Sequence, residues 1–196
     1  MATKAPSKDI NEREMNVLFS RREIAVEIER LAGEIRRDYA PLLHGQEGGG
    51  IRTEQQELLL VGVLKGAFVF MADLVRALDM PVAVDFVRVS TYGSSTESSR
   101  KPRVVQGVRT PIKGRHVLVV EDIVDTGITS SFLLDYLRQR GAASVRLCAL
   151  LSKPARRQVD VKIDYLGFTV PDLFVVGYGL DFAQQYRHLP DICVLE

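Results

Sequence analysis

The stretch VLVVEDIVDTGITS, residues 117–130, decides the fold of this 196-residue chain. Four apolar residues open it, two adjacent acids follow at Glu121 and Asp122, and a third acid, Asp125, begins the small turn Asp-Thr-Gly. An apolar pattern with helical spacing starts soon afterwards, at Phe132. This order predicts a buried strand, a tight loop and a helix N-terminus, where free N–H groups and the positive end of the helix dipole favour a phosphate.

Apolar runs and helical patterns alternate on both sides of this stretch. Further strands are predicted at 58–64, 82–89, 145–151, 163–168 and 173–176, and further helices at 20–40 and 67–78. Ser20 and Glu23 have capping-box spacing at the start of the first of these helices, and Pro41 is expected to end it. The alternation predicts an α/β fold with a mostly parallel, doubly wound sheet flanked by helices. Ligands bind such sheets at the carboxyl ends of the strands.

Composition and charge exclude several classes of protein. Hydrophobic residues make up 46% of the chain, so it is neither disordered nor fibrous. The 26 basic and 25 acidic residues leave a net charge of +1, which argues against a dedicated nucleic-acid binder. The two cysteines lack metal-ligand spacing, and neither a signal peptide nor a membrane-spanning run is visible. We expect a disordered tail over 1–12, a single domain over 13–196 and a cytoplasmic location.

The residue types of the opening stretch point to a phosphorylated sugar. Gly127 lets the backbone approach an anion closely, and Thr126 and Thr129 can donate hydroxyl hydrogen bonds. Glu121 and Asp122 are compatible with a nearby phosphate only if hydroxyl donors or Mg²⁺ intervene. A lone acid after a strand is more often a helix cap, but the whole combination is far more specific. It predicts a ribose diol and a divalent cation.

These residues also carry a family resemblance. The stretch resembles the 5-phosphoribosyl-1-pyrophosphate (PRPP) signature of the type I phosphoribosyltransferases, and the chain is similar to the bacterial hypoxanthine-guanine phosphoribosyltransferases. Four other segments match that family in order: Leu64-Lys65-Gly66, Thr91-Tyr92-Gly93, Ser152-Lys153-Pro154 and the hood segment over 170–187. Five motifs in the right order are hard to obtain by chance. Ile128 stands where relatives often carry a basic residue, which bears only on a side-chain contribution to phosphate affinity.

The resemblance implies a fold, a reaction and partners. A small hood lobe would be formed by the N-terminal segment and about 165–196. PRPP and a 6-oxopurine, hypoxanthine or guanine, would react at purine N9 to give IMP or GMP and pyrophosphate, through an oxocarbenium-like ribose. Mg²⁺ would be required, no membrane or nucleic acid would take part, and the assembly would be a homodimer or homotetramer.

The resemblance also implies residue roles in the PRPP site. PRPP would be held by Lys65, Gly66, Glu121, Asp122, Asp125, Thr126, Gly127, Ile128, Thr129 and Arg187. Mg²⁺ would be bound by Glu121, Asp122 and Asp181. Thr91 and Tyr92 would close over the site and exclude water. The Leu64–Lys65 peptide would be cis.

The purine would be held by Lys153, Phe174, Val175 and Asp181. Lys153 would donate to O6, Phe174 would stack on the base and Val175 would offer main-chain groups. Asp125 would act as the general acid–base that shares the N7 proton while N9 attacks.

Plainer alternatives exist for these residues and for the chain. Lys65 and Lys153 could be solvated surface lysines, Phe174 could belong to the core, and Asp181 and Arg187 could form an ordinary surface pair. The 91–92 segment could be a surface loop without a gating role. The alternative function is a regulatory protein of the same fold that senses nucleotides or binds RNA. It would need a basic face, and the sequence shows no such concentration of charge.

Overall fold

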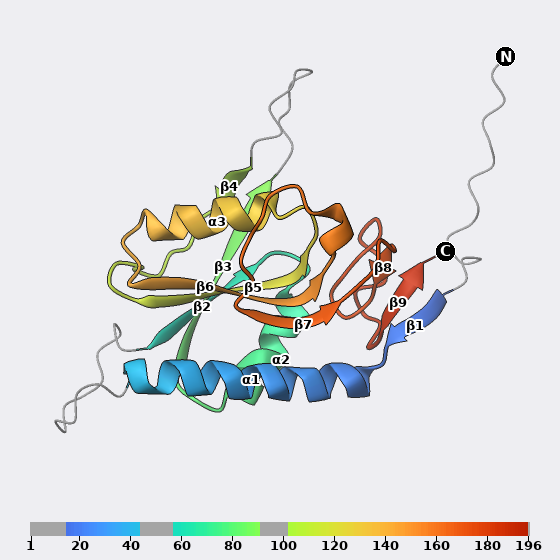
Figure 1. Cartoon of the computed structure of the whole chain (residues 1–196), viewed down its shortest axis with the longest axis horizontal. Helices are drawn as coiled ribbons and strands as arrows, with labels where there is room; N and C mark the ends of the chain where they lie inside the picture. Colours follow the sequence, from blue (N-terminus) through green and yellow to red (C-terminus); the bar gives the residue numbers. More distant parts are fainter. Residues whose placement is uncertain (1–14, 44–56, 91–101, 196) are drawn as a thin grey trace, which may run out of the picture.

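The apolar runs of the sequence form one large sheet of six strands. In the computed structural model, which describes residues 15–43, 57–90 and 102–195, the strand order is β4-β3-β2-β5-β6-β7 (Figure 1). The bounds are β2 Leu58–Val63, β3 Val82–Ser90, β4 Arg103–Gln106, β5 His116–Val124, β6 Ser144–Ser152 and β7 Tyr165–Thr169. All neighbours are parallel except β3 and β4. The predicted mostly parallel α/β fold is therefore confirmed.

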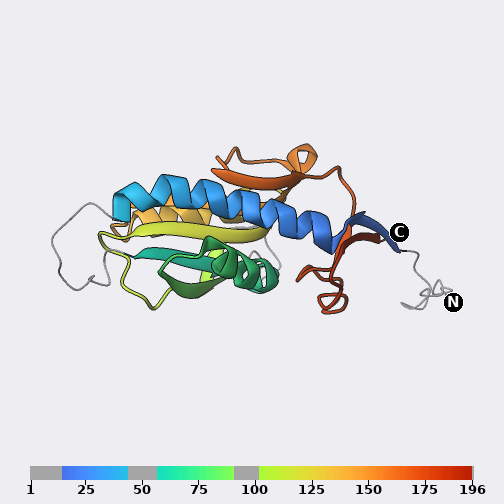
Figure 2. The ribbon, with the colours of Figure 1, turned by 90° about the horizontal axis from the view of Figure 1, so that it is seen from below.

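Helices cover both faces of the large sheet, as a doubly wound sheet requires. They are α1 Arg21–Leu43, α2 Phe68–Leu78 and α3 Ile128–Arg138, with a short 3-10 turn η3 at Pro154–Arg156. The first two lie on one face and α3 lies on the other (Figures 1 and 2). Strand alternation divides the core in the same way, because Leu60 and Val120 pack with α1 and α2 whereas Val61 and Val119 pack with α3. β2 is buried at every position because both its faces are covered.

The first helix begins as predicted but ends later. The Ser20 backbone N–H donates to Glu23 Oε2 at 2.8 Å, and the Glu23 N–H donates to Ser20 Oγ at 3.3 Å, so the capping box is formed. The expectation that Pro41 ends the helix is wrong, because α1 continues to Leu43 with Pro41 inside it. Proline in the last turn removes only its own N–H bond there. No helix in the described ranges combines the length and apolarity needed to cross a membrane.

A second, antiparallel sheet of three strands stands beside the carboxyl ends of the large one (Figure 1). Its order is β1-β9-β8, and its strands are β1 Met15–Phe19, β8 Val175–Val176 and β9 Ile192–Leu195. Strand β7, in contrast, pairs with β6 in the large sheet, so the C-terminal contribution to the small sheet begins only after Thr169. The tail predicted over 1–12 lies outside the described residues.

Candidate active site

A polar cavity lies where the carboxyl ends of β2, β5 and β6 meet the small sheet. Its volume is about 450 Å³, and it is lined by Leu64, Lys65, Gly66, Arg88, Asp122, Ile123, Asp125, Lys153, Phe174, Val175, Leu180, Asp181, Gln184 and Arg187. Most of the residues predicted for the site are therefore brought together from segments far apart in the chain. Parallel strands place their carboxyl ends at one edge of a sheet, which explains why motifs after different strands converge.

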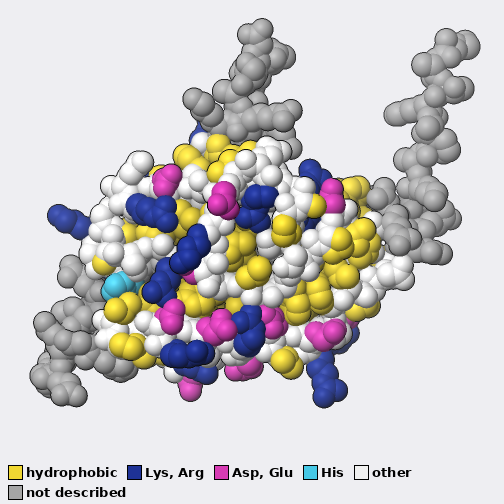
Figure 3. All heavy atoms as spheres, viewed as in Figure 1, with side chains coloured by type: hydrophobic (Ala, Val, Ile, Leu, Met, Phe, Trp, Pro, Cys, Tyr) yellow, Lys and Arg dark blue, Asp and Glu magenta, His cyan; other side chains and the backbone are white. Residues whose placement is uncertain are grey.

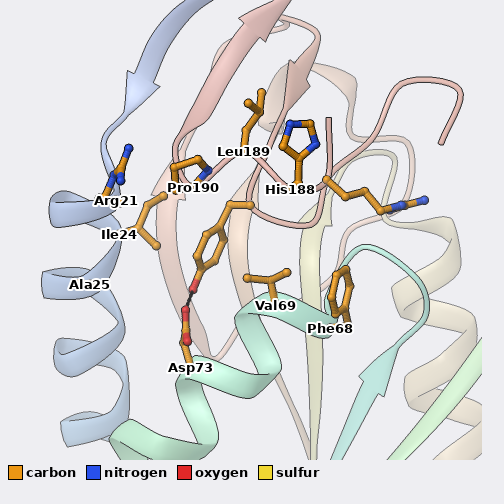
Figure 4. Close-up of a pocket in the computed structure, with 11 residues that line it drawn as sticks. Arg21, Ile24, Ala25, Phe68, Val69, Asp73, His188, Leu189 and Pro190 are labelled. Carbon is orange, nitrogen blue, oxygen red and sulfur yellow. Dashed lines mark hydrogen bonds between the residues drawn. The ribbon is translucent and has the colours of Figure 1, made fainter. Parts of the chain in front are cut away.

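A larger cavity of about 610 Å³ lies between α1, α2 and the segment 187–190 (Figure 4). Mainly apolar side chains line it, among them Ile24, Val69 and Pro190. Asp73 supplies its one carboxylate, which already accepts a hydrogen bond from the Tyr178 hydroxyl. Because the acids at the strand ends line the smaller cavity, we assign the chemistry there.

The two acids after the apolar half of β5 point to opposite faces of the sheet. Glu121 faces α3, is 5% exposed and accepts a hydrogen bond from Ser130 Oγ at 3.2 Å. Asp122 lines the cavity on the other face, beside Gly66. Burial and repulsion from Asp122 raise the pKa of Glu121 to about 8, and burial raises the pKa of Asp122 to about 6. Such an acid pair favours cations and hydroxyl donors as ligands.

Gly66 is required by its contact with Asp122. A Cβ atom built on Gly66 would lie 1.6 Å from Asp122 Oδ2, closer than any real contact. The neighbouring Leu64–Lys65 peptide is cis, as the resemblance implied. The Lys65 ammonium donates to Gln184 Oε1 at 3.0 Å, so this loop also contacts the segment that follows β8.

The loop between β5 and α3 presents free backbone N–H groups. Gly127 caps α3 with a φ of 81°, and a Cβ there would lie 2.3 Å from the Val159 carbonyl oxygen. The N–H groups of Asp125, Thr126 and Gly127 donate to no other group in the described ranges, and that of Ile128 makes only a 3.4 Å contact with Thr126 Oγ1. Consecutive free amides at a helix N-terminus form an anion site.

The Asp125 carboxylate lies at the boundary between this loop and the cavity. Its Oδ1 atom is 3.1 Å from Arg156 Nε in an ion pair but accepts no hydrogen bond from the described residues. The same guanidinium reaches Asp172 Oδ1, 3.6 Å from Nη1. Asp125 is thus paired with a cation and still has an acceptor atom for a ligand N–H.

Two residues predicted for the purine site, Lys153 and Phe174, do not have the surroundings that the plainer interpretations require. Lys153 is only 7% exposed, and its ammonium has no hydrogen bond or ion pair with another described residue. The ammonium can donate three hydrogen bonds, and a ligand in the cavity that Lys153 lines can supply the acceptors. Phe174 is 49% exposed rather than a core residue, and Val175 beside it is buried. The cavity wall therefore offers an aromatic face and a cation to a planar polar ligand.

Asp181 and Arg187 do form an ion pair, with Oδ1 and Nη2 2.7 Å apart. Both side chains are half-buried in the cavity wall, and Arg187 also donates to the Gly179 carbonyl at 2.7 Å. These contacts therefore fix the shape of the segment between β8 and β9 where it lines the cavity. Thr91 and Tyr92 lie outside the described residues.

Several residues of the site escaped the sequence analysis. Arg88 and Gln184 line the cavity, whereas Arg156 and Arg157 contact the loop after β5. Arg88 could have been found, because it lies near the carboxyl end of β3, next to β2 in the sheet. Conversely, some residues predicted for the site do not line the cavity, namely Glu121 and Thr126–Thr129.

Charge on the face shown in Figure 3 does not favour a nucleic-acid interface. On the face in Figure 3, basic and acidic side chains of the described residues lie intermixed. A regulator that binds RNA would need a continuous basic face.

The chain is similar to known proteins over most of its length. The family model of the phosphoribosyl transferase domain matches residues 18–183. The hypoxanthine-guanine phosphoribosyltransferase of Bacillus subtilis is 42% identical over 180 residues, 92% of either protein. The hypoxanthine phosphoribosyltransferase of Haemophilus influenzae is 41% identical over 175 residues, 89% of this chain and 92% of that one. A crystal structure of a Bacillus anthracis hypoxanthine-guanine phosphoribosyltransferase superposes with a TM-score of 0.80, at 38% identity, covering 94% of this chain and 100% of that one.

Proposed function

Because the chain belongs to the phosphoribosyltransferase family, we infer that it is a purine salvage enzyme. It transfers the 5-phosphoribosyl group of PRPP to N9 of a 6-oxopurine, hypoxanthine or guanine, and releases IMP or GMP and pyrophosphate. The observation that carries this function is the buried, unpartnered Lys153 in the same cavity as Asp122 and Asp125. One wall can bind a base while the strand-end loops bind a sugar phosphate.

The loop after β5 is proposed to hold the phosphoribosyl group. The free amides of Asp125–Gly127 and the hydroxyls of Thr126 and Thr129 would bind the 5′-phosphate. Asp122 would accept a hydrogen bond from the ribose diol. Glu121, whose pKa of about 8 favours the protonated form in the ligand-free protein, would add negative charge only when a nearby cation favours its ionised form. As pyrophosphate departs, positive charge develops on the ribose, and these carboxylates would stabilise it. Ile128 would contribute only its backbone.

The opposite wall is proposed to hold the purine. Lys153 would donate to O6, Phe174 would stack on the ring, and Val175 and Asp181 would contact its far edge. Asp125 would accept the N7 proton as N9 attacks the ribose. Its Oδ1 atom accepts no hydrogen bond from the described residues, and Arg156 forms an ion pair with the carboxylate. Proton transfer of this kind contributes about 10²–10⁴-fold to a rate.

The site also suits a pyrophosphate that carries Mg²⁺. No group of three or more His, Cys, Asp or Glu side chains within the described ranges could hold an ion alone. Mg²⁺ is usually bound through one or two carboxylates together with substrate phosphates, so Asp122 and Asp181 in the cavity wall fit it, with Glu121 behind them. When bound, Mg²⁺ would neutralise the leaving pyrophosphate. Lys65, Gly66 and Arg187 would contact that pyrophosphate from the protein side, and Thr91 and Tyr92 would cover it.

Four further proposals concern the hood, the domain, the location and the assembly of the protein. We propose that the small sheet is the hood over the base and that 13–196 form one domain. The free thiols of Cys148 and Cys193 fit a reducing, cytoplasmic location. A homodimer or homotetramer is proposed as the assembly, which sedimentation would test.

A panel of free bases tests the function. Protein with PRPP and Mg²⁺ should form nucleotide from hypoxanthine and guanine and reject adenine, which lacks the 6-oxo acceptor for Lys153. Nucleotide formation and pyrophosphate release are measured together. Folded protein that turns over no purine under these conditions would exclude the assignment.

Replacing Lys153 with methionine keeps the stem and removes the ammonium. We expect the KM for hypoxanthine to rise by about 10- to 100-fold, because a hydrogen bond to a charged group contributes about 1.5–3 kcal/mol. Discrimination against adenine should fall as well. Steady-state kinetics with both bases measure this, and Lys162→Met, an exposed lysine paired with Asp164, is the control. Unchanged selectivity would remove Lys153 from base recognition.

The ligand-free protein should lose stability as the pH rises. Because the pKa of Glu121 is raised from 4.5 to about 8, the folded state binds the proton more tightly than the unfolded chain does. The contribution of Glu121 to the free energy of unfolding is fully present below about pH 4.5, the pKa in the unfolded chain. It is lost as the pH rises through about 8, the pKa in the folded protein. Melting temperatures between about pH 5 and about pH 9 measure the effect. Glu121→Gln should flatten the profile, whereas Glu29→Gln, at an exposed site on α1, should not.

A further inference from the structure

The loop after β5, residues 125–127, is the one proposed to bind phosphate and is called the phosphate loop below. A short segment after η3, residues 157–159, packs against the side of this loop where its carbonyl groups lie. The half-buried guanidinium of Arg157 makes three contacts there. Nε donates to the Asp125 carbonyl at 3.2 Å, and Nη2 donates to the Val124 carbonyl at 3.4 Å and to Ser152 Oγ at 2.8 Å. The backbone N–H groups of Gln158 and Val159 both donate to the Thr126 carbonyl, at 2.9 and 3.1 Å. Three consecutive loop carbonyls are therefore bound from one side.

Binding those carbonyls fixes the direction of the loop amides. In a planar trans peptide, the C=O of one residue and the N–H of the next point in opposite directions. With the carbonyls of Val124, Asp125 and Thr126 held by the 157–159 segment, the following N–H groups point away from it. These are the N–H groups of Asp125, Thr126 and Gly127, which have no partner in the described ranges. The support thus makes this loop a preorganised anion site.

The same guanidinium joins the phosphate loop to the purine wall. Ser152, whose hydroxyl accepts from Arg157, ends β6 and directly precedes Lys153. The Lys153 backbone N–H also donates to the Val124 carbonyl at 3.0 Å, so Lys153 and the Arg157 guanidinium share this acceptor. Arg157 is therefore bonded to the strand ends that carry the two halves of the site, β5 and β6.

We propose that Arg157 is a positioning residue that sets the affinity for the 5′-phosphate and, through Ser152, the placement of Lys153 against the 6-position of the base. This rests on the proposed function. Arg157 touches neither substrate, and its fixed charge lies behind the loop, where it also favours an anion in front. Small misplacements of a binding group cost up to about 100-fold, so loss of the guanidinium should be visible in kinetics.

The test replaces Arg157 with methionine, which keeps the hydrocarbon stem that packs beside Gly127. The KM for PRPP should rise by about 10- to 100-fold with a smaller change in kcat, and preference for hypoxanthine over adenine should fall with it. Arg157→Lys should recover part of both. The matched control is Arg36→Met, because Arg36 is also half-buried and donates to a backbone carbonyl, that of Ala77 at 2.6 Å, but joins α1 to α2. It should lower the melting temperature and leave both kinetic quantities unchanged.

A double variant separates positioning from general loosening of the fold. If Arg157 acts on selectivity through Lys153, Arg157→Met in a Lys153→Met background should change selectivity no further. Additive losses would overturn the proposal, and so would a PRPP KM within about twofold of the wild type in Arg157→Met. Should that variant not fold, Arg157→Gln, which also removes the charged group, decides by the same criterion. A wild-type protein without turnover would instead refute the proposed function, so the two failures are distinguishable.

Discussion

Asp125→Asn is expected to lower kcat by about 10²–10⁴-fold while the affinity for PRPP stays nearly unchanged. The amide cannot accept the N7 proton, yet the backbone N–H groups that bind the phosphate remain in place. Steady-state kinetics give kcat, and calorimetric titration with PRPP gives the affinity separately. The prediction depends on the position of Asp125 between the phosphate loop and the base wall.

Asp172→Asn is the matched control for this variant. Asp172 shares Arg156 with Asp125 but is exposed and outside the cavity lining. Its replacement should leave kcat close to that of the wild type. If Asp125→Asn instead abolished PRPP binding and kept its turnover rate, the proposed acid–base role would be wrong.

Gly66→Ala should reduce kcat/KM for PRPP by about 100-fold or more. The added Cβ would lie only 1.6 Å from Asp122 Oδ2 and would clash with it, so either the carboxylate or the loop must move. Both are proposed to contact PRPP, one through the ribose diol and the other through pyrophosphate. Kinetics at varied PRPP, with product inhibition by pyrophosphate, locate the loss.

Gly33→Ala in α1 is the matched control for Gly66→Ala, and it should leave activity unchanged. Nothing lies within 4 Å of a Cβ at Gly33. Alanine should raise the free energy of unfolding by about 0.5–1 kcal/mol because it favours the helix, with activity unchanged. Normal PRPP kinetics in Gly66→Ala would show that the contact between Gly66 and Asp122 has no part in binding.

Much of the fold could be predicted because its strands are long and buried. The continuous apolar run of β2 and the helical spacing in α1 are local patterns, so the alternation of strands and helices was visible in the sequence. Strands β1, β4 and β9 were not predicted. Each is only four or five residues long, and β1 and β9 are stabilised by pairing across nearly the whole chain. Such pairing leaves little local pattern.

Site residues that lie next to strand ends could be predicted from the sequence. Residues that reach the site only through contacts between distant segments could not. Lys65, Asp125 and Lys153 come within two residues of strand ends, so the parallel sheet predicts that they converge. Arg157 contacts residues that precede it by more than thirty positions, which no spacing rule reveals. The different surroundings of Glu121 and Asp122 could have been predicted, because adjacent residues of a strand face opposite sides.

The pairing of β1 with β9 has a consequence for synthesis on the ribosome. Met15 lies opposite Leu195, so β1 is synthesised long before β9 and has no partner in the small sheet until β9 emerges. The β2–β6 layers can condense earlier, because their contacts close as each strand emerges. Nascent chains halted before β9 should therefore hold a folded phosphate loop without a finished base pocket, and selectivity for the nucleobase would be the last property to mature.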